Sequence, residues 1–168
     1  MSATVDTSVH KLNDSWTLWA HLPHDVDWSV QSYQLIDTVD TVEGVIALME
    51  TLPDKLINNC MLFFMRKNIM PQWEHPLNRN GGCFSYKVGE KLAAGAWREL
   101  SYALAGETLS VNKGLLRTIN GITISPKKKF CISKIWLSSC TYQDPTEIVD
   151  LHGIDPHGCL FKKHSPQD

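Results

Sequence analysis

Apolar and polar residues alternate over several short segments, which predicts that strands dominate this chain. In residues 15–20 the alternation places Trp16 and Leu18 on one face and Trp19 on the other, as the two-residue period of a strand requires. β-branched residues on both sides of a turn at 126–129 indicate a hairpin. The apolar run at residues 59–66 predicts a buried strand. The other predicted strands cover residues 15–20, 32–39, 82–88, 121–125, 130–137 and 159–163.

Two longer segments follow the 3.6-residue period of a helix. The stronger pattern runs over residues 91–106 and stops at Gly106. The other begins at Asp40, which can cap the helix together with Glu43, and Pro53 ends it. The apolar stripes of these helices contain Val42, Val45, Ile46 and Met49 in one and Ala93, Ala96, Trp97, Leu100 and Leu104 in the other.

The order of these segments predicts one α+β domain. Strands predominate and their links are hairpin-like, so we expect an antiparallel sheet with two or three helices, including a short helix at 144–147. A length of 168 residues suits one domain, and a hydrophobic fraction of 43% argues against disorder. The domain is expected over residues 14–163, between a flexible tail at 1–13 and a second tail at 164–168.

Cysteine use and hydropathy favour a cytoplasmic protein. No apolar run approaches the roughly 20 residues that span a bilayer, and the start of the chain lacks the apolar segment of a signal peptide. The five cysteines are an odd number and contain no Cys-x-x-Cys pair, which favours reduced thiols over a disulfide framework.

Tryptophans and a lysine run are the candidate ligand-binding residues. Trp28 lies in a polar loop, and Trp73 is followed by Glu74 in a loop flanked by proline. Electron-rich indole rings can hold a flat cation between them. Lysines at 127–129 precede the strand that ends near Trp136. This combination indicates a cationic base that carries phosphates. A net charge of −2 argues against binding along a long nucleic-acid backbone, so we expect contact with one nucleotide or one end.

Other residue clusters suggest no catalysis or cofactor. Neither a nucleophile–base motif nor a glycine-rich phosphate loop is present, so the sequence predicts no enzyme. His152, His157 and Cys159 lie close in sequence but lack a fourth ligand of suitable spacing, so no metal is expected. Taken alone, the lysine run is typical of a solvated hairpin tip. The tryptophans that fit a hydrophobic core are Trp16, Trp19 and Trp97.

An ordered set of short motifs resembles the eukaryotic translation initiation factor 4E family, whose members bind the mRNA 5′ cap. The motifs follow the family's order and approximate spacing over about residues 10–140. The resemblance implies a curved antiparallel sheet backed by helices on its convex face, with the cap on the concave face. The motifs are His10-Lys11-Leu12-Asn13, Trp16-Thr17-Leu18-Trp19, Asp40-Thr41-Val42-Glu43, Pro71-Gln72-Trp73-Glu74, Asn78 through Gly81-Gly82, Trp97-Arg98-Glu99-Leu100, Gly106-Glu107 and Ile135-Trp136.

This resemblance gives each candidate residue a role. Trp28 and Trp73 would sandwich the 7-methylguanine, and Glu74 would accept hydrogen bonds from the N1–H and N2–H groups of the base. Trp136 would lie against the N7-methyl group. The cations implied for the cap phosphates are Lys127, Lys129 and Lys134.

The chain departs from the family near the cap. Trp28 fits only with a shift of about one residue in its loop, and Phe84 stands where the family has a further tryptophan. Lys127 replaces an arginine, which removes a bidentate donor. His75 replaces an acid.

The resemblance also implies a scaffold or regulatory protein that docks on the convex face. The family's helix-borne tryptophan is Ile46 here, and Arg98 and Tyr102 stand where leucines are usual. The residues implied for this contact are His10, Leu12, Val42, Ile46, Trp97, Arg98, Glu99 and Tyr102.

Three functions therefore stay open. A monomeric cap-binding protein in translation initiation or its regulation is the main expectation. The alternatives are a divergent homologue that binds caps weakly and represses or reroutes transcripts, and a protein-interaction module that has lost cap binding.

Overall fold

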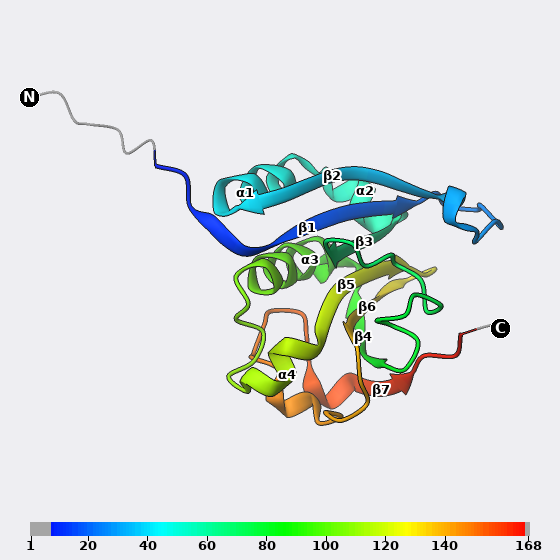
Figure 1. Ribbon diagram of the computed structural model, residues 1–168. Coiled ribbons are helices and arrows are strands. Elements are labelled where there is room, and N and C mark those ends of the chain that lie inside the picture. The colour runs from blue at the N-terminus through cyan, green and yellow to red at the C-terminus, as the bar shows by residue number, and fades with distance from the viewer. Residues whose placement is uncertain (1–7, 167–168) are drawn as a thin grey trace, which may run out of the picture.

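The computed structural model describes residues 8–166. Within these residues, seven antiparallel strands form one sheet in the order β2-β1-β3-β5-β6-β4-β7. Each strand overlaps one that the sequence predicts, and β5 and β6 form the expected hairpin. Figure 1 shows the sheet running through the whole molecule. The strands are β1 (Lys11–His21), β2 (Tyr33–Thr41), β3 (Met61–Arg66), β4 (Gly82–Gly89), β5 (Ile119–Pro126), β6 (Phe130–Leu137) and β7 (Cys159–Lys163).

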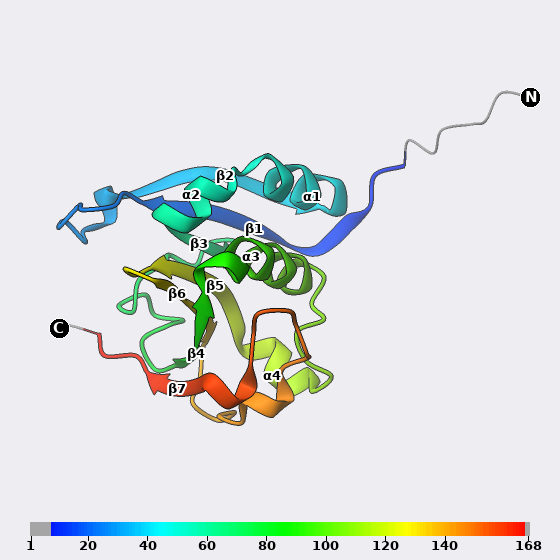
Figure 2. The ribbon, with the colours of Figure 1, turned by 180° about the vertical axis from the view of Figure 1, so that it is seen from behind.

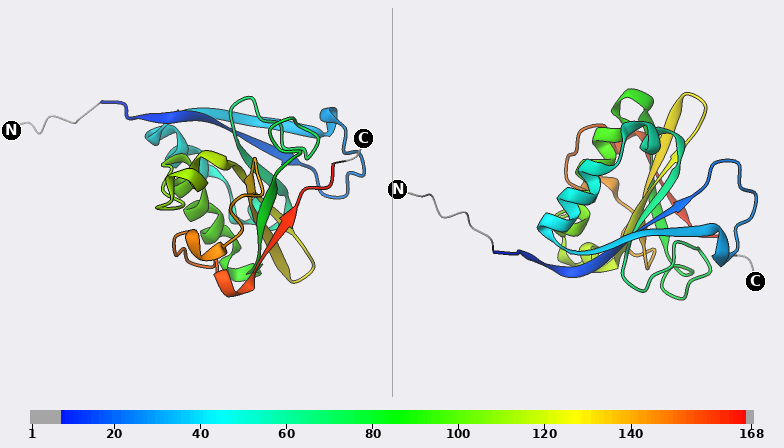
Figure 3. Two further views of the ribbon diagram at one scale, coloured as in Figure 1. Left: turned by 60° about the horizontal axis from the view of Figure 1, so that its bottom comes forward. Right: turned by 90° about the horizontal axis from the view of Figure 1, so that it is seen from above.

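The longest helices cover one face of this sheet. Figure 3 shows α1 and α3 on the same side of the curved sheet, which we call the convex side. None of the described helices is long and apolar enough to cross a membrane. The α-helices are α1 (Val42–Thr51), α2 (Asp54–Asn59), α3 (Glu90–Ala105) and α4 (Lys113–Thr118), and short 3-10 helices cover Val30–Ser32, Pro145–Glu147 and Pro156–Gly158.

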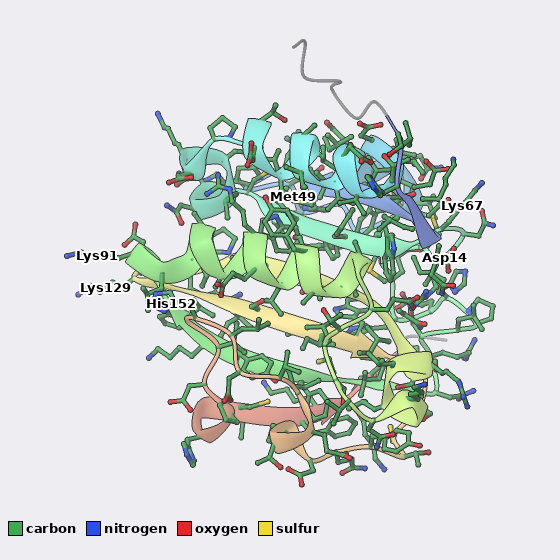
Figure 4. The ribbon with its side chains drawn as sticks, turned by 90° about the vertical axis from the view of Figure 1, so that its left-hand side faces the viewer. Asp14, Met49, Lys67, Lys91, Lys129 and His152 are labelled. Atoms are coloured by element: carbon green, nitrogen blue, oxygen red, sulfur yellow. The ribbon has the colours of Figure 1, made fainter. Side chains whose placement is uncertain are left out.

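The main hydrophobic core lies between the convex side of the sheet and the helices. Trp16 and Leu18 of β1 are fully buried there, together with Trp97 of α3 and Met49 of α1. Met49 projects from α1 toward α3 in Figure 4. The next residue of β1, Trp19, packs instead against a smaller cluster on the other, concave side. The predicted alternation in β1 is therefore confirmed.

The start of α1 differs from the prediction. Thr41, rather than Asp40, caps the helix, because its Oγ1 accepts a hydrogen bond from the Gly44 N–H at 3.0 Å. Asp40 is still in β2 and forms an ion pair with Lys11, with 2.8 Å between carboxylate oxygen and Nζ. Glu43 accepts a hydrogen bond from the backbone N–H of His10, just before β1, instead of closing a capping box.

Two six-residue helices were not predicted. The helix α2 occupies Asp54–Asn59, so β3 begins later than the predicted strand at residue 59. The helix α4 follows Asn112, whose Oδ1 accepts hydrogen bonds from the N–H groups of Gly114 and Leu115. Helices this short present fewer than two turns, so their apolar residues cannot establish a period.

The ends of the domain extend beyond the expected boundaries. β1 begins at Lys11, inside the expected N-terminal tail, because its first residue pairs with Thr41 of β2. Residues 1–7 of that tail lie outside the described residues. His164, placed in the C-terminal tail, is 7% exposed, since β7 pairs with β4 and carries it into the concave side of the molecule.

Candidate ligand-binding site

A cavity of about 760 Å³ opens on the concave side of the sheet. Its walls come from the loop between β1 and β2 and the loop between β3 and β4, and its floor comes from β3, β5 and β6. Five of the predicted site residues line it, although they are far apart in the sequence. They are Trp28, Trp73, Glu74, Lys134 and Trp136.

Trp28 is held in place by a neighbouring imidazole. The ring of His21 stacks on the indole with 3.7 Å between centroids and 7° between planes, and Tyr33 meets both rings edge-on. His21 itself is buried, and its Nε2–H donates to the Asp27 carbonyl at 2.7 Å. Because Trp28 remains 52% exposed and lines the cavity, His21 supports the indole without closing access to it.

A buried asparagine organises the loop that carries Trp73 and Glu74. Asn78 is fully buried, and its Nδ2 donates to the carbonyls of Met70 and Gln72, at 2.9 Å in each case. The Asn120 amide donates to Asn78 Oδ1 at 2.9 Å, which ties the loop to β5. Gln72 Nε2 donates to the Trp28 carbonyl at 3.3 Å and so joins the two walls of the cavity.

Trp136 forms the buried part of the floor, and His164 lies beside it. The rings of Trp136 and His164 are 5.0 Å apart between centroids, and His164 is also nearly parallel to Trp73, at 5.9 Å and 14°. His164 Nδ1–H donates to the Asn78 carbonyl at 2.6 Å. Burial lowers the pKa of His164, and the nearby charge of Lys134 acts in the same direction.

The two histidines behind the tryptophans were missed by sequence analysis. His21 ends β1 and His164 follows β7, and neither belongs to a motif that indicates a ligand. The pairing of β7 with β4 places His164 beside Trp136 in the cavity floor. His21 follows Trp19 by two residues, and the two-residue period of a strand places both side chains on the same side of β1. This spacing is the signal that could have identified His21.

Because the pKa of His164 is lowered in the folded protein, we expect the stability of the protein to depend on pH. Since folding lowers this pKa below its usual value of 6.5, the unfolded chain binds the proton more readily. The free energy of unfolding should therefore fall as the pH decreases below about 6.5. Urea titrations at a series of pH values should show that His164→Gln loses part of this dependence. His157→Gln, at an exposed histidine, is the matched control. If the free energy of unfolding of His164→Gln depended on pH as steeply as that of the parent, the lowered pKa of His164 would be wrong.

The predicted cations are not all at this cavity. Lys134 lines it, whereas Lys127 lines an adjoining cavity that shares Trp28 with the first. Lys129 is exposed at the turn between β5 and β6 and lines neither cavity (Figure 4). The resemblance implies that the hairpin lysines contact the cap phosphates, and the structure places both of them outside the base cavity.

Burial and the charge of Glu74 raise the pKa of Tyr33 to about 12, so its hydroxyl stays protonated in the cavity.

On the convex side, a groove of about 330 Å³ separates α1 from α3. Val42, Ile46 and Tyr102, which were implied for partner contact, line this groove. Trp97 does not reach it, because its side chain points into the core and is fully buried. The structure therefore corrects the placement of Trp97 on the partner-binding surface.

Arg98 has a structural role in the same region. Its guanidinium donates to the carbonyls of Met49 and Leu52 at 3.1 and 2.7 Å and pairs with Asp54 at 2.7 Å. These carbonyls lie at the end of α1. Arg98 thus fastens α3 to the junction of α1 and α2, which explains how a charged residue is accommodated there.

The other residues implied for partner contact bind within the chain. Glu99 accepts a hydrogen bond from the His152 N–H at 2.8 Å, and Figure 2 shows the segment between β6 and β7 running beside α3. His10 pairs with Glu43 across 2.5 Å. Leu12 packs against the main core. These residues border the convex side but have intramolecular partners in the described structure.

The fold and the site define a class: α+β proteins with a curved antiparallel sheet, helices on its convex side and a tryptophan-lined cavity on its concave side. Residues 11–153 match the family model for eukaryotic initiation factor 4E, and the chain belongs to this family. The resemblance noted from the motifs is thereby confirmed.

Curated relatives have moderate identity. The chain is 29% identical over 157 residues to eukaryotic translation initiation factor 4E-2 of Schizosaccharomyces pombe, a match that covers 88% of this chain and 62% of the relative. It is 30% identical over 138 residues to eukaryotic translation initiation factor 4E of Candida glabrata, with coverage of 78% and 64%. The chain thus spans less than two thirds of the length of these relatives.

Solved structures share the fold. A complex of C. elegans eIF4E-3 with the 4E-binding protein Mextli and cap analog has a TM-score of 0.71 at 23% identity, covering 80% of this chain and 77% of the other. Schistosome eIF4E complexed with m7GpppG and 4E-BP has a TM-score of 0.70 at 26% identity, with coverage of 79% and 74%. These likenesses confirm the predicted fold class.

Proposed function

We propose that this chain binds the 7-methylguanosine 5′ cap of mRNA in translation initiation or its regulation. The observation that carries the proposal is the meeting of Trp28, Trp73, Glu74 and Trp136 in one cavity. Family membership and the cap complexes formed by related proteins support the same reading. The protein would act in the cytoplasm as a binding module without catalysis.

The geometry suits a cationic base. Methylation at N7 gives guanine a positive charge, which strengthens stacking against the indoles of Trp28 and Trp73 by roughly 1–2 kcal/mol per ring when water is excluded. The carboxylate of Glu74 would accept charge-assisted hydrogen bonds from the N1–H and N2–H groups. Trp136, which is 4% exposed, would give the N7-methyl group an apolar surface.

The cap phosphates would extend from Lys134 toward the hairpin turn. Lys134 lines the base cavity, and Lys127 and Lys129 would meet phosphates that leave it. A triphosphate needs only a few cations, which is compatible with a net charge of −2. We therefore expect a shallow decrease of affinity with salt, since the log–log slope is roughly −0.7 per phosphate contact for single strands.

Selectivity for the methylated base tests this proposal. Titrations that follow tryptophan fluorescence should give much tighter binding of 7-methyl-GTP than of GTP, because only the methylated base is cationic. Glu74→Gln should weaken 7-methyl-GTP binding, since an amide accepts less strongly and presents N–H donors to the donors of the base. Equal affinities for 7-methyl-GTP and GTP would reject the proposed function.

The convex groove favours a second role in protein binding, which would operate beside cap binding. Ile46 is 41% exposed and lines the groove with Val42 and Tyr102. Such an apolar groove between two helices suits an amphipathic helical segment of a scaffold or regulatory protein. Repression or rerouting of transcripts by a divergent homologue would use the same surface.

Because Ile46 replaces a tryptophan of the family, we expect the usual partner peptide to bind this chain more weakly. A peptide with the tyrosine-and-leucine motif should bind this chain worse than it binds relatives with tryptophan at this position, by about 1–3 kcal/mol, because the indole N–H and much apolar area are missing. Ile46→Trp should strengthen peptide binding in calorimetric titrations. Affinity for 7-methyl-GTP should not change, since the two sites lie on opposite sides of the sheet. Tight peptide binding by the parent, with no gain in the variant, would show that the replacement is silent.

A further inference from the structure

The imidazole of His21 covers one face of the Trp28 indole. The two rings are 3.7 Å apart between centroids, with 7° between their planes. Trp28 lines both the base cavity and the adjoining cavity of about 780 Å³, whereas His21 lines the adjoining cavity and not the base cavity. One face of the indole is therefore occupied by the imidazole, and the opposite face is left for the proposed base.

Contacts from β1 and β2 fix the position of this imidazole. His21 is 2% exposed, its Nε2–H donates to the Asp27 carbonyl at 2.7 Å, and Tyr33 meets the ring edge-on at 5.5 Å. The loop that carries Trp28 projects beyond the ends of both strands (Figure 1), so the stack on His21 ties the indole to the end of β1. Because Nε2 already carries a proton, a second proton would enter at Nδ1 and give the imidazolium cation.

We propose that His21 controls the binding of the cationic base through Trp28, and that the charge of its imidazole sets the affinity. The neutral imidazole holds the indole in the orientation on which the base stacks. The imidazolium would instead place a competing cation on the other face of the same indole. This inference rests on the proposed function, since it takes the ligand between Trp28 and Trp73 to be 7-methylguanine. His21 is a positioning residue, because it contacts Trp28 and not the ligand.

Two cations on opposite faces of one indole oppose each other. Both are attracted by the same electron-rich ring, and they lie about two stacking distances apart, or roughly 7 Å. The repulsion of two unit charges over this distance corresponds to about 3- to 50-fold in affinity, for effective dielectric constants between about 80 and 20. The neutral base of GTP would not meet this repulsion, so protonation of His21 should weaken binding of the methylated base selectively.

The charged groups around His21 both favour and oppose the imidazolium. Hydrogen bonds from Ser29 hold the pKa of Asp27 below its usual value, and the charge of His21 acts in the same direction. The Asp27 carboxylate therefore stays ionised and favours a cation at His21, whereas the lysines of the adjoining cavity oppose it. The other titratable residues that contact His21 or line the same cavity are His24, Asp25, Tyr33, Cys60, Lys127 and Lys128.

The pH dependence of 7-methyl-GTP binding tests the inference. Calorimetric titrations of the full chain should be made between about pH 7.5 and 5.5, within the range where histidine changes charge. Over this range the parent should lose about 3- to 50-fold more affinity than His21→Phe, which keeps an aromatic ring on the indole but cannot take up a proton. Titration of the ligand and of His164 is common to both proteins and cancels in the comparison.

Two further variants separate the charge of His21 from its packing. His21→Gln removes the ring and the charge, so it should bind about 2- to 10-fold more weakly than His21→Phe at every pH, the range for one aromatic pair. His24→Asn is the matched control, since His24 is exposed in the same loop and its backbone φ of 68° suits asparagine. Its affinity should depend on pH as that of the parent does.

A measurement on the parent alone needs no substitution. Coupling between a proton and a ligand is reciprocal, so saturating 7-methyl-GTP should move proton uptake by the His21 imidazole to lower pH in an NMR titration. The exposed His157 should not respond.

The outcomes distinguish this inference from the proposed function. Failure of the parent to bind 7-methyl-GTP at about pH 7.5 would overturn the proposed function and the inference with it. Tight binding with the same pH dependence in the parent and His21→Phe would overturn the inference alone. So would a His21 imidazole that stays neutral over the whole range, or one whose proton uptake the ligand does not move.

Discussion

Trp97→Ala should lower the free energy of unfolding by about 3–5 kcal/mol, the range for removal of a large aromatic side chain from a core. Trp97 is fully buried between α3 and the sheet, so its loss leaves a cavity in the main core. Its Nε1 atom has no hydrogen-bond partner in the described structure, and the expected loss is therefore one of packing. Urea unfolding followed by circular dichroism measures the effect.

A conservative variant separates the core role of Trp97 from a role in partner binding. Trp97→Phe keeps much of the buried area and should lose much less stability than Trp97→Ala. If Trp97→Ala kept the stability of the parent but weakened binding of the tyrosine-and-leucine peptide, the residue would belong to the partner surface. The peptide should lose no affinity with Trp97→Phe.

Strand prediction worked in β1 because successive side chains point to opposite sides of the sheet, so each side receives every second residue. In β1 the core takes Trp16 and Leu18 while the concave side takes Trp19, so the pattern survives in sequence. The cap of α1 was harder to assign, since Asp40 and Thr41 are both good capping residues. Tertiary contact decided between them, because Lys11 of the adjacent strand pairs with Asp40 and leaves Thr41 to the helix.

The site residues that could be predicted are those whose side chains indicate a ligand by themselves, such as a tryptophan or a Trp-Glu pair in a polar loop. Trp28 and the Trp73-Glu74 pair stand out in polar loops, and the structure brings all three residues to one cavity. The supporting histidines could not be found in the same way, since His21 and His164 act through ring contacts across distant strands.

The lysines of the hairpin show a different limit. The resemblance assigns Lys127 and Lys129 to the cap phosphates, but it does not say which cavity each of them lines. Lys134 lines the base cavity, because alternate residues along β6 face the same side and place it beside Trp136. The hairpin turn leaves the sheet and breaks that alternation, so sequence spacing no longer indicates which cavity a turn residue lines.

Trp73→Ala should nearly abolish cap binding, with a loss of about 2 kcal/mol or more. One face of the proposed sandwich would disappear, and water would reach the cationic base, which weakens its stacking against Trp28. Fluorescence or calorimetric titration with 7-methyl-GTP measures this loss. The loop should remain in place without the indole, because Asn78 holds it through hydrogen bonds to the Met70 and Gln72 carbonyls.

Trp73→Leu is the matched variant, since it keeps an apolar side chain but removes the π-system that attracts a cation. If cation–π attraction provides the selectivity, Trp73→Leu should lose more affinity for 7-methyl-GTP than for GTP, so that the ratio of the two affinities falls toward one. Simple loss of apolar contact would instead weaken both ligands by a similar factor. A Trp73→Ala protein that is folded by circular dichroism and binds 7-methyl-GTP as the parent does would show that the base does not stack on Trp73, and the cap site would have to lie elsewhere.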